Sequence, residues 1–182
     1  MTGENTAKSF LLITALAGGA FTIHAQRIKI VVVDASRGKP VTDECLNVSL
    51  GQWHGADLLV PTDKDGVATL IFETNQVSIV PVLGRTCNGM VSTKPLPIAS
   101  GTETISVVTN YYVSCQYSNK LVKDPDWLKA SPAQRIPVFT LHEIIARGIV
   151  ATNSCSKFAR APQPGELLLV VRKRTFLEGM RS

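Results

Sequence analysis

The sequence predicts a mainly β protein: a two-layer antiparallel sandwich with a small α/β C-terminal extension. Short runs rich in β-branched residues recur between Gly- and Pro-bearing turn clusters, and no segment with helical periodicity separates them before residue 110. Two such runs meet at Asp65-Gly66, which is the strongest short-range hairpin signal. These observations favour a sandwich over βαβ units, with a hairpin over residues 59–72.

The first 25 residues are typical of a secretory signal peptide. Lys8 precedes an apolar run over residues 10–23, and the small residue Ala25 follows. About 14 apolar residues are fewer than the roughly 17–25 that a membrane helix needs. We therefore expect cleavage near Ala25, with Ala20 as an earlier site and an uncleaved anchor as the alternative, and a secreted or periplasmic protein without a stable membrane span after cleavage.

The net charge of +5 is unevenly distributed. Residues 26–110 hold seven basic and eight acidic side chains, whereas residues 111–182 hold eleven and five. A basic C-terminal region indicates an anionic partner, such as an envelope component, a glycan or a protein, or else a solvated surface. Export and the few aromatic residues near the cations argue against nucleic acid. The candidate surface comprises Lys157, Arg160, Arg172, Lys173 and Arg174.

All four cysteines follow the signal segment, and an even number in an exported chain predicts two disulfides. Four cysteines allow three pairings, and proximity in the sequence favours Cys45–Cys87 and Cys115–Cys155. No C-x-x-C spacing occurs, which argues against a structural zinc site or a thioredoxin-type redox pair.

The expected strands can be followed along the chain. The run over 27–34 ends in the turn cluster 35–40, and the run over 44–50 alternates, with Leu46, Val48 and Leu50 on one side. After the expected hairpin, Pro81 makes the run over 76–83 an edge strand or a bulged strand. Residues 84–101 read as a long connection, and residues 102–113 return to strand composition.

These motifs resemble a known family of sandwich domains. The succession IKIVVVDASRGKPV, NVSL, TDKDGVATL and VSIVPV is similar to carboxypeptidase regulatory-like and transthyretin-like (prealbumin-like) domains. The resemblance covers residues 27–108 and implies such a domain over residues 26–110, in an exported bacterial protein. The family's G-x-Y-x-L strand after the hairpin is replaced by residues 75–79.

Residues 111–182 are expected to form the extension, with one short helix and a final strand. Residues 124–128 begin with Asp-Pro and predict a helical turn. Residues 140–146 predict a helix in which Thr140 and Glu143 form a capping box and Gly148 supplies the stop. The apolar run over 166–172 reads as a buried strand, which needs cover on both faces and so completes the body of the fold.

No set of side chains in the sequence indicates catalysis, a metal or a cofactor. His142-Glu143 begins the zinc motif H-E-x-x-H, but Ala146 stands at the second histidine position. Asp63 and Asp65 resemble the start of a calcium-binding loop. Such a loop needs a Glu six residues after its Gly, where this sequence has Phe72. The sequence thus predicts a non-enzymatic secreted binding or adaptor module whose ligand no motif identifies.

The alternative function is a small hydrolase or a metal-dependent oxygenase on a prealbumin-like fold. Prealbumin-like sandwiches include iron dioxygenases that use two tyrosines and two histidines as iron ligands. The resemblance therefore implies that tyrosines and histidines of this chain are candidate metal ligands. The candidate ligands are His54, Tyr111, Tyr112, Tyr117 and His142.

Overall fold

The computed structural model describes residues 25–51, 57–87, 94–98, 102–115, 137–151, 155–157 and 160–173. Several predicted features lie outside these ranges: the predicted signal segment before Ala25, the helical turn expected at residues 124–128, and Arg174, His54 and Tyr117.

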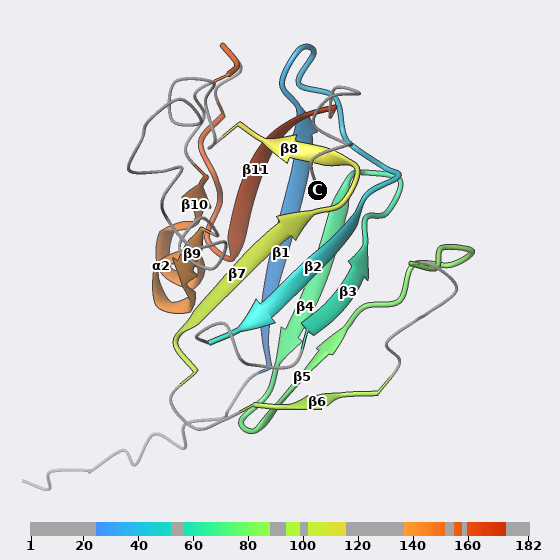
Figure 1. The fold of residues 1–182 in the computed structure, drawn as a ribbon. Coiled ribbons are helices and arrows are strands. Elements are labelled where there is room, and N and C mark those ends of the chain that lie inside the picture. The colour runs from blue at the N-terminus through green and yellow to red at the C-terminus, as the bar shows by residue number, and fades with distance from the viewer. Residues whose placement is uncertain are drawn as a thin grey trace, which may run out of the picture.

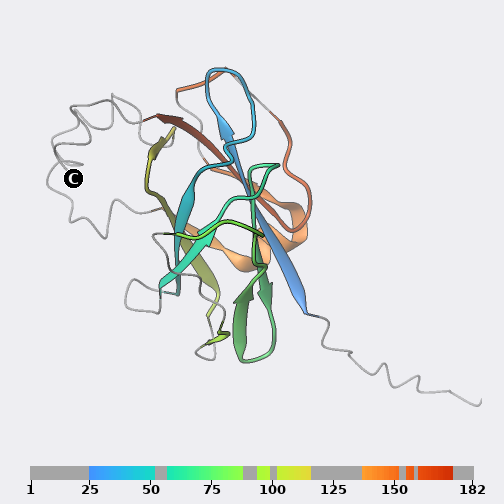
Figure 2. The same ribbon diagram turned by 90° about the vertical axis from the view of Figure 1, so that its right-hand side faces the viewer.

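The described residues form two β sheets packed face to face, as Figure 2 shows edge-on, and a single short helix. The larger sheet contains β1 (Gln26–Asp34), β4 (Val67–Phe72), β5 (Gln76–Ile79), β6 (Leu96–Pro97), β8 (Tyr112–Ser114), β10 (Ile149–Val150) and β11 (Glu166–Lys173). The smaller sheet contains β2 (Cys45–Leu50), β3 (Asp57–Pro61), β7 (Thr104–Thr109) and β9 (Val138–Thr140). The helix is α2 (Leu141–Arg147). The predicted mainly β sandwich is confirmed (Figure 1).

The core lies between the sheets, where alternate residues of each strand meet. Ile28, Ile30 and Val32 of β1 are buried on the inner face, and they belong to the same cluster as Leu46 and Val48 of β2. Because side chains alternate between the two faces of a strand, the period-2 pattern of the sequence identifies this inner face correctly.

The expected hairpin over residues 59–72 is wrong. β3 pairs with β2 in the smaller sheet, whereas β4 pairs with β1 and β5 in the larger sheet. The Asp65-Gly66 turn does reverse the chain, but it also carries the chain from one sheet to the other. An Asp-Gly turn specifies a local reversal, and the positions of β1 and β2 on different sheets decide where the two arms pair.

Two other predicted strands differ from the observed strands in their bounds or in the sheet that they join. The run over 102–113 divides at Asn110 into β7 and β8, which belong to different sheets. The run over 76–83 ends at Ile79, before Pro81, and it is not an edge because β6 pairs beyond it. Proline lacks the N–H that a ladder needs, which explains the early end.

The C-terminal region completes the larger sheet. β11 lies between β1 and the short strands β10 and β8, and its pairings with β1 and β10 are parallel. Leu168 and Val170 are buried on its outer face and Leu167 and Leu169 on its inner face, so β11 is covered on both sides. These parallel pairings are the part of the sandwich that the antiparallel prediction did not include.

The helix begins and ends near the expected residues, but its cap differs from the prediction. The Thr140 hydroxyl donates to the Glu143 carboxylate, and no side-chain hydrogen bond caps the backbone at Thr140. The reciprocal capping box is therefore not formed. At the other end the Gly148 N–H donates to the Ile144 carbonyl, as expected for a helix stop.

Gly66 occupies a position that a larger residue cannot share. Its φ is 72°, and a Cβ there would lie 2.7 Å from the Val32 carbonyl oxygen and 2.9 Å from the Val41 nitrogen. These two backbone groups also hydrogen-bond to each other at 3.0 Å. The Asp63 carboxylate accepts N–H groups from Asp65 and Val67 and fixes the same turn.

We predict that Gly66→Ala lowers the free energy of unfolding by about 2–4 kcal/mol, since the left-handed backbone and the displaced contacts both add strain. The matched control is Gly84→Ala, because Gly84 has a φ of 74° but a Cβ at that residue would meet no atom within 4 Å. The control should lose only about 1 kcal/mol. Equal losses in urea denaturation would show that the contacts with Val32 and Val41 do not matter.

Candidate functional site

Three connections between the sheets meet at one end of the sandwich, the upper end in Figure 1. Residues 35–44 lead from β1 to β2, residues 62–66 from β3 to β4, and residues 110–111 from β7 to β8. β11 also ends here, because it runs parallel to β1. Loops and strand ends from distant parts of the sequence are therefore gathered in one place.

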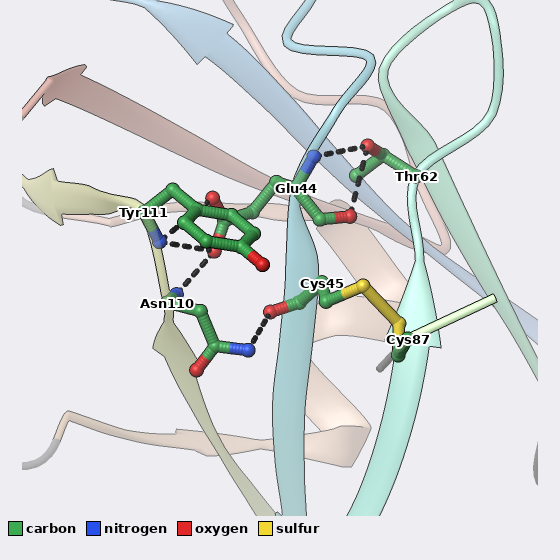
Figure 3. Close-up of a disulfide and its surroundings, with 6 residues drawn as sticks. All are labelled: Glu44, Cys45, Thr62, Cys87, Asn110 and Tyr111. Atoms are coloured by element: carbon green, nitrogen blue, oxygen red, sulfur yellow. Dashed lines mark hydrogen bonds between the residues drawn. A yellow bond between two sulfur atoms is a disulfide. The ribbon is translucent and has the colours of Figure 1, made fainter. Parts of the chain in front are cut away.

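Glu44 is the last residue of the β1–β2 connection, and it hydrogen-bonds to both of the other connections (Figure 3). The residue is only 1% exposed, and its carboxylate accepts the backbone N–H groups of Asn110 and Tyr111, the latter at 3.1 and 3.2 Å. Its backbone carbonyl accepts the Thr62 N–H at 2.9 Å, and its own N–H donates to the Thr62 hydroxyl at 3.2 Å. The side chain thus satisfies donors that no strand partner reaches.

The two disulfides have the pairings that the sequence favoured. Cys45–Cys87 has a Cα–Cα distance of 5.7 Å and lies beside Glu44, where the Asn110 amide donates to the Cys45 carbonyl at 2.7 Å (Figure 3). Cys115–Cys155 has a Cα–Cα distance of 5.0 Å and joins the end of β8 to residues 155–157. Both bonds therefore brace the end of the sandwich at which the connections meet.

An open hollow of about 540 Å³, here called the polar groove, lies at this end of the molecule. The β1–β2 connection forms most of its wall, and β8 and β11 supply the rest. It is lined by Asp34, Ser36, Arg37, Lys39, Pro40, Val41, Thr42, Asp43, Tyr112 and Lys173. Three of these side chains are cations and two are carboxylates, so the groove carries both signs with a positive excess.

Both carboxylates of the groove are engaged by neighbouring groups. The Ser36 hydroxyl donates to Asp34 and lowers the pKa of that carboxyl, with help from the N–H groups of Ser36 and Arg37. The Tyr112 hydroxyl donates to Asp43 at 3.1 Å. Burial of its ring, together with this carboxylate, raises the pKa of Tyr112 to about 12.

Four residues of the predicted anionic-partner surface lie in the described ranges, and they are not all in one place. Lys173 lines the polar groove, and Arg172 precedes it at the end of β11. Arg160 instead pairs with Glu166 at the start of β11, about 23 Å away along the strand. Lys157 is exposed, two residues after Cys155. Only Lys173 of the described members contributes to the groove.

Sequence reasoning missed Arg37 and Lys39. Both stand in the turn cluster 35–40, whose composition predicts a chain reversal and no ligand contacts. Two cations in so short a connection between strands are the signal that could have identified them, because loops at strand ends often carry binding residues. Glu44 is likewise predicted only as the first residue of a strand.

The residue types expected for a metal centre do not gather in the described ranges. No group of three or more His, Cys, Asp or Glu side chains could hold a metal ion there. His142 lies on α2 near the start of β11, whereas Tyr112 pairs with Lys173 at its end. The carboxylate of Asp63 accepts N–H groups of its own turn, which explains the D-K-D-G motif as turn chemistry.

No helix in the described residues is long and apolar enough to cross a membrane.

A second hollow of about 350 Å³ lies beside α2 and is lined mainly by β9 and β10. Its only charged side chain, Glu143, already accepts the Thr140 hydroxyl and pairs with Arg147. The polar groove is therefore the better candidate for a binding site.

Comparisons with known proteins found no relative of this chain. No family model matches the chain, and no curated protein or solved structure does so either. The resemblance to carboxypeptidase regulatory-like domains thus stays a prediction from the sequence motifs.

We predict that Glu44→Ala lowers the free energy of unfolding by about 3–4 kcal/mol, because it removes the charged acceptor of two part-buried N–H groups. Glu44→Gln, which keeps one acceptor oxygen, should lose about 2 kcal/mol. Glu103→Ala is the control, since Glu103 is exposed and its loss should cost no more than about 0.5 kcal/mol. If Glu44→Ala behaves like this control in denaturant titrations, the carboxylate does not hold the connections.

We also predict that Tyr112 ionises only at a pH of about 12. Because the folded-state pKa is raised, the neutral phenol stabilises the fold fully below pH ~10, and this contribution is lost as the pH rises towards 12. The phenolate absorbance step near pH 12 should be absent in Tyr112→Phe and should move to lower pH in Asp43→Asn. A Tyr112→Phe titration that retains the step near pH 12 would contradict the assignment.

Proposed function

We propose that the chain is an exported, non-enzymatic binding module that holds an anionic group of its partner in the polar groove. The observation that carries the proposal is the placement of Arg37, Lys39 and Lys173 around one hollow. Within the described part of the chain, none of these three side chains forms a salt bridge or a side-chain hydrogen bond. No direct ion pair therefore neutralises these charges, although the Arg37 charge helps to lower the pKa of Asp34.

The carboxylates of the groove do not remove this positive excess. Asp34 is occupied by donors of its own turn, and Asp43 accepts the Tyr112 hydroxyl. An incoming phosphate, sulfate or carboxylate can thus approach the three cations, whose exposed positions keep their side chains hydrated and accessible. Since exposed charges are screened by salt, the affinity should fall as the ionic strength rises.

The covalent structure supports an exported location. Two disulfides persist in an oxidising compartment, and the N-terminal segment is typical of a signal peptide. In that setting the partner would be an anionic envelope component, a glycan or a protein. The enzymatic alternative has no specific observation in its favour among the described residues, where no metal-ligating group assembles.

The test is binding of the purified exported protein to a sulfated polysaccharide resin and to vesicles that contain an acidic phospholipid. Replacing Arg37, Lys39 and Lys173 together by alanine should weaken binding to at least one probe about 100-fold at low salt, since each cation near an anionic surface contributes about 1 kcal/mol. The two probes separate a glycan partner from a lipid headgroup.

The matched control replaces Arg27, Arg85 and Lys94 by alanine, which changes the net charge equally at exposed residues outside the groove. This control should bind as the unaltered protein does. Equal losses in both triple variants would show that net charge alone is responsible, and failure of the unaltered protein to bind either probe would reject an anionic partner of these two classes.

A further inference from the structure

The two disulfides differ in their access to solvent. Cys87 is 1% exposed and its partner Cys45 is half-buried, whereas Cys155 is exposed and only its partner Cys115 is buried. Thiol–disulfide exchange requires a thiolate to reach one sulfur of the bond. Access therefore favours attack on the Cys115–Cys155 bond, at the Cys155 sulfur.

The Cys115–Cys155 bond is also connected to two walls of the polar groove. On one side, Cys115 directly follows β8 and its N–H donates to the Val170 carbonyl at 2.8 Å, and β8 carries Tyr112 opposite Lys173. On the other side, Ser156 follows Cys155 and its hydroxyl donates to the Ala35 carbonyl.

The start of the β1–β2 connection is held by β11, the strand that also holds β8. The Ala35 N–H donates to the Val171 carbonyl of β11 at 2.7 Å, and the next residue, Ser36, lines the groove. The disulfide thus clamps β8 and the start of the β1–β2 connection against the end of β11. β8 pairs with β11 over three residues, Tyr112 to Ser114.

We propose that Cys155 is a site of reductive modification, at which an external dithiol opens the Cys115–Cys155 bond and so loosens the polar groove. One thiolate of the dithiol attacks the Cys155 sulfur, the bond to Cys115 breaks, and the Cys115 sulfur leaves with the electron pair and takes up a proton. The second thiol of the reductant then displaces Cys155 from the mixed disulfide. Two electrons reduce the protein to two thiols, and the dithiol becomes a cyclic disulfide.

Opening this bond has a local consequence. The cross-link between residues 40 positions apart is removed, while Cys45–Cys87 and the Glu44 contacts still hold the other connections. The strand β8 and Ala35 should therefore open to solvent more often, and Tyr112 and Ser36 should lose their fixed positions in the groove. The effect on ligand affinity rests on the proposed binding function, but the chemical and structural effects do not.

The first measurement is differential alkylation of the native protein during timed treatment with dithiothreitol in the absence of denaturant. Peptide mass spectrometry should find Cys115 and Cys155 labelled at least tenfold faster than Cys45 and Cys87. Faster or equal labelling of Cys45 and Cys87, or simultaneous labelling of all four cysteines, would overturn the proposed site.

The second measurement is amide hydrogen exchange of the half-reduced protein. Exchange at residues 112–115 and at Ala35 should rise at least tenfold, while exchange at Leu46 and Val60 of the smaller sheet stays unchanged. A Cys115→Ala/Cys155→Ala variant should show the same rise without reductant, and Cys45→Ala/Cys87→Ala should not reproduce this pattern. Unchanged exchange at residues 112–115 would refute the link to the groove.

The third measurement is binding of the oxidised and half-reduced proteins to the sulfated polysaccharide resin and the acidic vesicles. Half-reduction should weaken binding at least tenfold to the probe that the oxidised protein binds. If binding is unchanged although exchange rises, redox control of the ligand is rejected. If the oxidised protein binds neither probe, the proposed function fails, whereas labelling and exchange still decide the fate of the modification site.

Discussion

The buried carboxylate of Glu44 is the constraint on which this end of the sandwich depends. Every passage of a chain between two sheets leaves backbone N–H groups without a ladder partner, and a buried donor without an acceptor is costly. Glu44 meets this need for Asn110 and Tyr111 with its side chain and for Thr62 with its main chain. One residue therefore fixes how the β3–β4 and β7–β8 passages lie beside the β1–β2 passage.

This arrangement explains why the polar groove lies at the same end. Tyr112, the first residue of β8, and Lys173, the last residue of β11, supply one part of its wall, and the β1–β2 connection supplies most of the rest. The strands thus place two side chains, while the connection carries exposed polar groups, as loops often do in binding proteins. The connection can carry Arg37 and Lys39 because their side chains take no part in holding it.

The disulfides join cysteines that follow one another along the chain, 42 and 40 residues apart, which limits the entropy lost on closing each loop. The sequence also predicts the strands well, because the alternation at Leu46, Val48 and Leu50 is local and reports which face is buried. It fails at residues 59–72 and 102–113, since alternation says nothing about which sheet a strand joins. The role of Glu44 was missed for the same reason, because its partner Tyr111 is distant in the sequence. The sequence also does not reveal that Arg37 and Lys39 share a groove with Lys173, since this depends on where β11 joins the sheet.

The parallel pairing of β11 with β1 explains why the polar groove and the Cys115–Cys155 disulfide lie at the same end of the sandwich. An antiparallel partner of β1 would begin at the end where β1 stops, whereas the parallel β11 brings its own last residues, with Lys173, to that end. The same direction places Val170 and Val171 beside Cys115 and Ala35, so that the exposed disulfide and the groove share one strand as their support. Cys45–Cys87 instead joins the start of β2, beside Glu44, to the β5–β6 connection of the larger sheet. Of the two bonds, Cys115–Cys155 is the one that is connected to the groove through β11, and it is the one with an exposed cysteine.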